Sequence, residues 1–383
     1  MVSPSQAQGP LRSVKVVEFV GLGPAPFCAM LLSDLGAEVI RIDRPGAFGG
    51  GAAEVLARGR RSLGVNLKKD GAVEACLTLL KSADILLEGY RPGVMERLGL
   101  GPEMVLKANP KLVYGRMTGW GQHGPLAHAA GHDLNYIALT GALEAIGPKE
   151  KPVPPLNLVG DFGGGSLYLA VGVLAALHHA KATGEGQVVD AAIVDGATHL
   201  MGAVHQLSAM TMWDRPRGEN LLDGGAPFYD CYECADGKFV SIAPLEPEFF
   251  AVLVQKLGLS GHEAMANQYD RATWPAMRDA FEQTFRSQPR DHWTQLLEGT
   301  DACFAPVLST AEAAAHPHMA ARESFAGIEG VVQSAPAPRF SRTPGALQGA
   351  GSKPGADTEA ILKDWGFEAE AIKKLKKDGA IGG

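Results

Sequence analysis

The fold is decided by two short runs rich in β-branched residues, Val14-Lys-Val-Val-Glu-Phe-Val20 and Glu38-Val-Ile-Arg-Ile-Asp43. The residues between them, Pro26–Leu35, have helical character, so this stretch predicts a strand, a helix and a second, parallel strand. The same alternation continues with an expected helix at Gly71–Ser82 and expected strands at Asp84–Glu88 and Leu112–Met117. We therefore expect an α/β protein with a large, doubly wound, Rossmann-like parallel sheet.

A dinucleotide site at the first turn is not favoured. The turn reads Gly21-Leu-Gly-Pro-Ala-Pro26, and Asp43 lies 20 residues after Gly23. Pro26 stands where the third glycine of the fingerprint belongs, and two prolines remove N–H donors that would hold a pyrophosphate. The sequence predicts a similar topology without that site.

Further along, Gly163-Gly-Gly165 precedes an apolar helix expected at Ser166–Ala180, and Gly184–Asp190 opens another strand. We expect the large domain to span residues 1–205 and to resume at 321–383. The segment 226–320 predicts a smaller α+β domain. Its expected elements are a hairpin (Tyr229–Cys234 and Lys238–Ala243) and helices at Phe249–Leu257, Trp274–Gln288 and Asp291–Leu297. Near the end, Pro336–Pro354 should be irregular and Thr358–Lys377 helical.

Composition indicates an ordinary globular protein of about two domains. The chain has 383 residues, 46% of them hydrophobic, with a net charge of -7 and a pI near 5.9, which argues against nucleic acid as a partner. The longest apolar run, Leu167–Leu177, is shorter than the roughly 20 residues that span a bilayer, and Met1–Pro10 lacks an apolar signal core. We expect no membrane partner.

Charge and cysteine content refine this view. Residues 1–120 hold 15 Lys and Arg against 11 Asp and Glu, so the acidic chain has a basic N-terminal third that suits an anionic ligand. Five scattered cysteines favour reduced thiols and a cytoplasmic location. Cys231 and Cys234 form the one close pair, but no second pair or nearby His completes a tetrahedral set, so we expect no metal site.

Three polar residues stand in unusual surroundings: His132 in Gly131-His-Asp-Leu-Asn-Tyr136, Asp161 before the glycine triplet, and Glu246 between Pro244 and Pro247. Each has a purely structural alternative: a hydrogen-bonded histidine, a helix N-cap and a cap or surface carboxylate, respectively. Together, a His and an Asp could remove a proton next to a carbonyl and return it on the opposite face. Backbone N–H groups near glycines could then stabilise the enolate oxygen.

A set of motifs, in order along residues 10–370, closely resembles the alpha-methylacyl-CoA racemases of the family III CoA transferase superfamily. The matching pieces are Val17-Glu18, Gly21-Leu-Gly-Pro24, Asp34-Leu-Gly-Ala37, Arg41-Ile-Asp-Arg-Pro45, Arg60-Arg-Ser62, Glu88-Gly-Tyr-Arg-Pro-Gly93, Gly119-Trp-Gly-Gln122, Gly131-His-Asp-Leu-Asn-Tyr136, Pro155-Leu-Asn-Leu158, Gly160-Asp-Phe-Gly-Gly-Gly165, Asp223-Gly-Gly-Ala-Pro-Phe228 and Glu246-Pro247. Pro244-Leu245 departs from the alanine-isoleucine pair common in close relatives.

This resemblance implies roles for individual residues. His132 and Asp161 would be the two acid/base residues, and Glu246 would bond to the histidine and orient it. Contacts to CoA would come from Arg44, Val65, Asn66, Leu67, Lys68, Gly89, Tyr90, Arg91 and Arg97, and the thioester end would be lined by Gly131, Asp133, Leu134, Asn135 and Tyr136. A structural alternative for Arg97 and Lys68 is a solvated surface charge.

The resemblance also implies epimerisation of 2-methylacyl-CoA thioesters by an interlocked homodimer, with neither metal nor organic cofactor. In that dimer, Glu246 would come from the partner subunit. One alternative is a CoA transferase in which Asp161 is an acyl-carrying nucleophile. Another is a thioester-binding sensor without catalysis. The presence of His132 favours the racemase, because a transferase has no use for a second proton carrier. The preferred acyl group is not specified by these residues. The C-terminus Ala-Ile-Gly-Gly lacks a peroxisomal Ser-Lys-Leu address, which favours a cytoplasmic enzyme.

Overall fold

The computed structural model describes residues 8–382 and divides the chain into two compact units. The first contains the chain up to Thr140, Leu156–Leu200 and the chain from Ala320 onward, and the second contains Gly141–Pro155 and Met201–Met319. The sequence placed 141–155 in the large domain, whereas the structure groups this segment with the second unit. There the Arg217 guanidinium donates hydrogen bonds to the carbonyls of Glu144, Pro148 and Lys149 at 2.9–3.1 Å.

The first unit is built on a six-stranded sheet in the order β3-β2-β1-β4-β5-β6, and every neighbouring pair is parallel. The strands are β1 Lys15–Phe19, β2 Glu38–Asp43, β3 Arg61–Gly64, β4 Ile85–Glu88, β5 Val113–Thr118 and β6 Val188–Ala192. The prediction of a parallel sheet is confirmed. The sequence reading missed β3, a four-residue strand in which only Leu63 is a large apolar residue.

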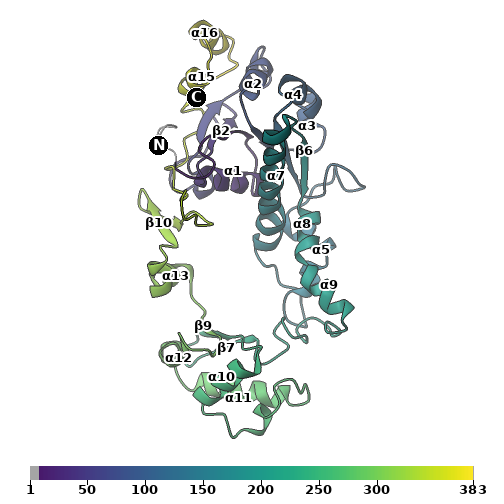
Figure 1. Cartoon of the computed structure of the whole chain (residues 1–383), viewed down its shortest axis with the longest axis vertical. Coiled ribbons are helices and arrows are strands. Elements are labelled where there is room, and N and C mark those ends of the chain that lie inside the picture. Colours follow the sequence, from purple (N-terminus) through teal and green to yellow (C-terminus); the bar gives the residue numbers. More distant parts are fainter. Residues whose placement is uncertain (1–7, 383) are drawn as a thin grey trace. The chain divides into compact units, whose positions relative to one another are not determined.

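Helices cover both faces of this sheet (Figure 1). Val16, Val39 and Ile85 point to one face, where they pack with α1 (Pro24–Asp34) and α7 (Leu167–Thr183). The alternate residues Val17, Ile40 and Leu86 point to the other, because successive side chains of a strand face opposite ways. That face is covered by α2 (Ala72–Leu80), α4 (Pro102–Ala108), α15 (Thr358–Asp364) and α16 (Ala369–Lys377). The sheet is therefore doubly wound.

The strand order reverses between β1 and β4, which are neighbours in the sheet but not in the sequence. In open α/β sheets, ligands bind outside the carboxyl ends of the strands at such a switch point. The residues that follow these two strands, Val20-Gly21 and Gly89-Tyr90, are therefore positioned at the expected ligand edge.

The glycine triplet lies within a helix rather than ahead of one. A π-helix, η3 (Leu158–Ser166), runs directly into α7, so the predicted start at Ser166 is wrong. The wider turn is visible in the hydrogen bond from the Phe162 N–H to the Asn157 carbonyl at 3.0 Å. Among the described residues, Leu158–Thr183 is the one helical run with the length and apolar composition of a membrane span. Leu169 and Val173 are fully buried against the sheet, whereas Leu158, Leu167 and Val171 are exposed in the single chain.

The second unit contains a three-stranded antiparallel sheet in the order β7 (Asp230–Glu233), β8 (Phe239–Ile242) and β9 (Phe304–Pro306). Its core is aromatic, with Phe228, Tyr232, Phe281 and Phe285 among its buried residues. The packed helices are α10 (Pro247–Lys256), α11 (Trp274–Arg286) and α12 (Arg290–Leu297). The predicted hairpin and three helices are confirmed.

Shorter elements complete the two units. In the first unit these are η2 (Val55–Ala57), α3 (Val94–Arg97), α5 (Asp133–Leu139), α8 (Ile193–Leu200), β10 (Phe325–Ile328) and β11 (Val331–Ser334); in the second, α6 (Ala142–Ala145), α9 (Gly202–Ala209), η4 (Glu263–Met265) and α13 (Thr310–Ala315); α14 (Pro317–Ala321) crosses the division. No helix or strand falls within Pro336–Pro354, as predicted. The single helix predicted over Thr358–Lys377 is instead two helices, separated at Gly366, whose φ is 84°.

Candidate active site

Two neighbouring pockets lie at the carboxyl edge of the parallel sheet. The first, which we call the His132 pocket, has a volume of about 180 Å³ and is lined by Gly89, Tyr90, Arg91, Pro92, Thr118, Gly119, Trp120, Ala127, Ala129, Ala130, Gly131, His132 and Tyr136. The second, the Lys68 pocket, has a volume of about 280 Å³ and is lined by Val20, Ile42, Asp43, Arg44, Val65, Asn66, Leu67, Lys68, Tyr90 and Leu98. Tyr90 borders both, so the two pockets adjoin.

His132 occupies the residue just before α5 and has an extended backbone, with φ −133° and ψ 174°. The Asn135 side chain accepts a hydrogen bond from the His132 backbone N–H at 3.1 Å, and the Asn135 N–H donates to the His132 carbonyl at 2.8 Å. These two bonds fix the backbone that carries the imidazole, while the side chain itself lies on the exposed wall of the His132 pocket. Asn135 thus has a positioning role in the structure.

Asp161 lies inside the π-helix and is partly buried. The Asn157 side-chain amide donates to its Oδ2 at 2.7 Å. Burial raises the pKa of the Asp161 carboxyl and the charge of Asp133 adds to this rise, whereas the Asn157 bond and the nearby His132 ring lower it. The alternative of an N-cap is not supported, because the side chain bonds to Asn157 and lies within the helix.

Asp133 faces inward from the first turn of α5 and is only 7% exposed. Its Oδ1 accepts the Asp161 backbone N–H at 2.7 Å, and its carboxylate also accepts the Gly160 backbone N–H. A side chain at Gly160 would place its Cβ 2.2 Å from this oxygen, so glycine is required there. Asp133 therefore ties α5, which follows His132, to the helix that carries Asp161. These two N–H groups are engaged by Asp133 and are not available to an enolate oxygen.

Tyr136 closes one side of the His132 pocket. Its hydroxyl donates to the Gly131 carbonyl, and its ring packs edge-on to Trp120 at a centroid distance of 4.7 Å. The ring lies so close to the end of β5 that a Cβ at Gly119 would be 2.0 Å from it. The motif that contains Gly119 and Trp120 thus shapes the wall of the pocket.

The predicted CoA contacts separate into three groups. Arg44, Val65, Asn66, Leu67 and Lys68 all line the Lys68 pocket, and Gly89, Arg91, Gly131 and Tyr136 line the His132 pocket. Tyr90 lines both. Arg97, Asp133, Leu134 and Asn135 line neither; Arg97 is an exposed residue of α3.

The buried ion pair between Glu88 and Arg116 stabilises the turn formed by Gly89, Tyr90 and Arg91. The Glu88 carboxylate accepts the Tyr90 backbone N–H at 2.7 Å and pairs with Arg116 at 2.8 Å. Glu88 is fully buried, and this burial raises the pKa of its carboxyl despite both bonds. Glu88 and Arg116 therefore position the loop whose Tyr90 borders both pockets.

Glu246 belongs to the second unit, where it is the exposed residue just before α10. The two residues before it are fixed through their carbonyls: the Gln268 side-chain amide donates to Pro244 at 2.7 Å and to Leu245 at 3.1 Å, and the Tyr269 hydroxyl also donates to Leu245. Burial and the charge of Glu246 raise the pKa of Tyr269.

Sequence reasoning missed Asn157 and the inward-facing role of Asp133. Both lie in quoted motifs, but nothing in their spacing shows which way the side chains turn. The described residues contain no group of three or more His, Cys, Asp or Glu side chains suited to a metal ion. Cys231 lies in β7 and Cys234 follows it, and both are free thiols.

A doubly wound parallel sheet with pockets at the carboxyl edge of its strands defines the class of α/β proteins whose ligand site lies at a topological switch point. Within that class, the chain belongs to CoA-transferase family III, whose family model matches residues 11–358. Two similar relatives are the alpha-methylacyl-CoA racemases of Mus musculus, 45% identical over 375 residues, and of Homo sapiens, 43% identical over 375 residues; each alignment covers 97% of this chain and 97% of the relative. A crystal structure of a CAIB/BAIF family protein from Brucella suis shares the fold, with a TM-score of 0.82, 24% identity and coverage of 94% of this chain and 100% of that one.

Proposed function

We propose that this chain is a racemase of 2-methylacyl-CoA thioesters, which interconverts the (2R) and (2S) epimers by proton transfer at the α-carbon. The observation that carries the proposal is the near-complete alignment at 43–45% identity with two proteins named alpha-methylacyl-CoA racemase. The electrostatics of the first unit accord with it, because burial raises the pKa of the Asp161 carboxyl and the His132 ring acts on the same group in the opposite direction.

In this proposal His132 and Asp161 are the two proton carriers. One takes the α-proton, the C–H electron pair moves into an enolate on the thioester, and the other returns a proton to the opposite face. For the reverse direction the roles exchange, so each group must both accept and donate near neutral pH. The raised pKa of Asp161 brings its carboxyl closer to that requirement.

The two adjoining pockets suit the two ends of a CoA thioester. Arg44 and Lys68 are exposed cations at the Lys68 pocket, where they would meet CoA phosphates. Arg91 at the His132 pocket and Arg97 nearby on α3 would add positive charge. Gly131 and Tyr136 would lie against the thioester, whereas Asp133, Leu134 and Asn135 would act from behind the pocket wall.

We further propose that the active enzyme is an interlocked homodimer and that Glu246 hydrogen-bonds His132 from the partner subunit. Neither a metal ion nor an organic cofactor takes part in this scheme, because two side chains suffice to move the proton. The five cysteines are all free thiols, which supports our proposal of a cytoplasmic location.

The decisive experiment is NMR of the purified protein with one enantiomer of a 2-methylacyl-CoA in deuterated water, without an acceptor acid. We expect the α-proton signal to disappear while the opposite epimer accumulates. If the thioester stays unchanged until a free carboxylic acid is added, and CoA then moves to that acid, Asp161 acts as a transferase nucleophile and the racemase proposal is wrong.

The same assay tests the two proton carriers. His132→Ala and Asp161→Ala should each lower the epimerisation rate by about 100-fold or more, since each removes a general acid/base group. Asp291→Ala, at an exposed site on α12, is the control and should retain the full rate. A near-normal rate in either site variant would remove that residue from the mechanism.

A further inference from the structure

The last described residues, 380–382, pair with residues 64–66, two of which, Val65 and Asn66, line the Lys68 pocket. The Asn66 backbone N–H donates to the Ala380 carbonyl at 2.8 Å, and the Gly382 N–H donates to the Gly64 carbonyl at 3.1 Å. These two bonds flank an antiparallel bridge between Val65 and Ile381. The C-terminal tail, Ala380–Gly382, thus pairs with the chain just where it leaves β3 and enters the pocket.

This pairing is buried. Val65 and Ile381 are each 4% exposed and Ala380 is 0% exposed, and all three belong to one hydrophobic cluster of the first unit. On its other side, the Val65 N–H donates to the Asp43 carbonyl at 2.8 Å. Val65 is therefore held between β2 and the tail, and water cannot replace the tail without exposing apolar surface.

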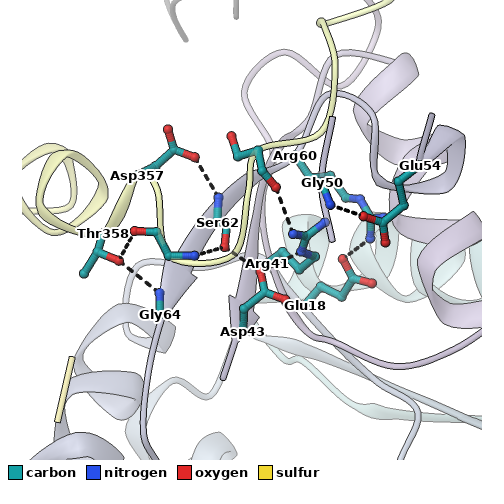
Figure 2. Close-up of polar contacts among 12 residues, drawn as sticks. Glu18, Arg41, Asp43, Gly50, Glu54, Arg60, Ser62, Gly64, Asp357 and Thr358 are labelled. Carbon is teal, nitrogen blue, oxygen red and sulfur yellow. Dashed lines mark hydrogen bonds and ion pairs between the residues drawn. The ribbon is translucent and has the colours of Figure 1, made fainter. Parts of the chain in front are cut away.

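A second part of the C-terminal segment hydrogen-bonds to Ser62 and Gly64 of β3, as Figure 2 shows. The Ser62 hydroxyl donates to Asp43 at 2.5 Å and accepts the Gly355 N–H at 2.7 Å. The Thr358 hydroxyl accepts the Gly64 N–H at 3.0 Å and lies 3.1 Å from the Gly382 carbonyl. Thr358 therefore connects the end of β3 to the tail itself.

The loop that follows depends on this support. Asn66 directs a tight turn, because its side-chain oxygen accepts the Lys68 N–H at 3.2 Å and its carbonyl accepts the Lys69 N–H at 2.9 Å. The tail fixes the orientation of the Asn66 peptide by accepting its N–H. Through the turn at Asn66, that orientation determines the position of the Lys68 backbone and thus of its side chain. Asn66, Leu67 and Lys68 all line the pocket.

We propose that the tail is a positioning segment for CoA binding: it holds the Val65–Lys68 loop in the conformation that receives the coenzyme. This inference rests on the proposed assignment of the Lys68 pocket to CoA. A loop that must be ordered by the ligand binds it more weakly than a loop already ordered by the protein.

The test is calorimetric titration with free CoA of the full chain, a chain ending at Gly379 and a chain ending at Ile381. Both truncations should bind CoA more weakly, by about 10-fold for the shorter chain. Gly64→Ala provides a full-length variant, because its Cβ would lie 1.8 Å from the Gly382 carbonyl oxygen and displace the tail. In the chain ending at Ile381, that oxygen is absent and the remaining close contact of the new Cβ is with the Gly355 Cα at 3.2 Å. Gly64→Ala should therefore weaken CoA binding less in this chain than in the full chain, which is the non-additivity expected for a direct contact.

The matched control is Ile372→Val, which removes a methyl group from the same buried cluster without touching the loop. It should lower thermal stability and leave CoA binding unchanged. Unaltered CoA binding in the folded truncated chains and in Gly64→Ala would refute the positioning role. If Lys68→Ala also leaves CoA binding intact, the pocket assignment itself is wrong; if Lys68→Ala weakens it while the tail variants do not, only the inference about the tail fails.

Discussion

At the residue scale, the proposed proton carriers are each held by polar neighbours whose own backbones are fixed. Asn135 holds the backbone of His132, whereas Asn157 bonds the side chain of Asp161 and Asp133 bonds its backbone. Of the two proposed proton carriers, Asp161 is the one whose ionised form is disfavoured by burial. Its pKa is raised chiefly by burial, so the ionised form is less stable in the folded protein than in the unfolded chain.

This predicts a pH-dependent gain in stability for Asp161→Asn. A carboxyl whose folded pKa is raised favours folding below its unfolded pKa, and that contribution is lost as pH rises through the folded pKa. At pH 7 the asparagine removes an ionised, partly desolvated group, so the variant should melt at a higher temperature than the parent protein while epimerisation is lost. Thermal melts at pH 7 and pH 4 would measure the difference, which should shrink at the lower pH.

Asp291→Asn is the control for this experiment, because Asp291 is an exposed residue of α12. Its melting temperature should follow that of the parent protein at both values of pH. A lower melting temperature of Asp161→Asn at pH 7 would show that the hydrogen bonds of the carboxylate outweigh its desolvation.

At the element scale, the π-helix η3, which carries Asp161, packs directly on α8. Gly164 of η3 and Gly196 of α8 make this close approach possible. A Cβ at Gly164 would lie 2.6 Å from the Ala197 backbone nitrogen, and a Cβ at Gly196 would lie 1.9 Å from the Gly164 carbonyl oxygen. Backbone contacts of this kind leave no room for adjustment by side-chain rotation. Gly164, the middle residue of the glycine triplet, therefore serves close packing of η3 on α8 within the first unit.

Gly164→Ala should accordingly destabilise the protein by about 1–3 kcal/mol, since the added methyl group overpacks a backbone contact. Gly202→Ala is the matched control: Gly202 begins α9 and a Cβ there meets nothing within 4 Å. It should be neutral or stabilising by up to about 1 kcal/mol, because alanine is the better helix former. Urea unfolding of both variants would measure the two changes; equal stabilities would contradict the packing argument.

At the scale of the whole molecule, the residues proposed for catalysis are divided between the two compact units. His132 and Asp161 lie in the first, and Glu246 lies in the second. We expect a homodimer in solution, with twice the 40.2 kDa of the chain in light scattering. A fully active monomer would contradict the proposed assembly.

Complementation tests the origin of Glu246. If Glu246 acts from the partner subunit, a heterodimer of His132→Ala and Glu246→Ala chains contains one intact site, and an equal mixture that exchanges subunits should recover roughly a quarter of the parent activity. If it acts within its own chain, every site in the mixture lacks one residue and no activity returns. Mixing two preparations of the same variant is the control.

The sequence alone determined the parallel sheet, although it missed the short strand β3. Runs rich in β-branched residues, such as Val14–Val20 and Glu38–Asp43, are local signals of strands, and their alternation with helical segments indicates parallel pairing. The resemblance, carried by short motifs, was sufficient to select His132, Asp161 and the residues of the Lys68 pocket as candidates.

Only the tertiary structure decided which way side chains turn and which distant segments meet. It turned Asp133 inward onto the Asp161 backbone, grouped residues 141–155 with the second unit through Arg217, and paired Ile381 with Val65. No local pattern encodes these contacts, because each joins residues far apart in the sequence. Their free energy comes from burying groups that the rest of the fold has already brought together.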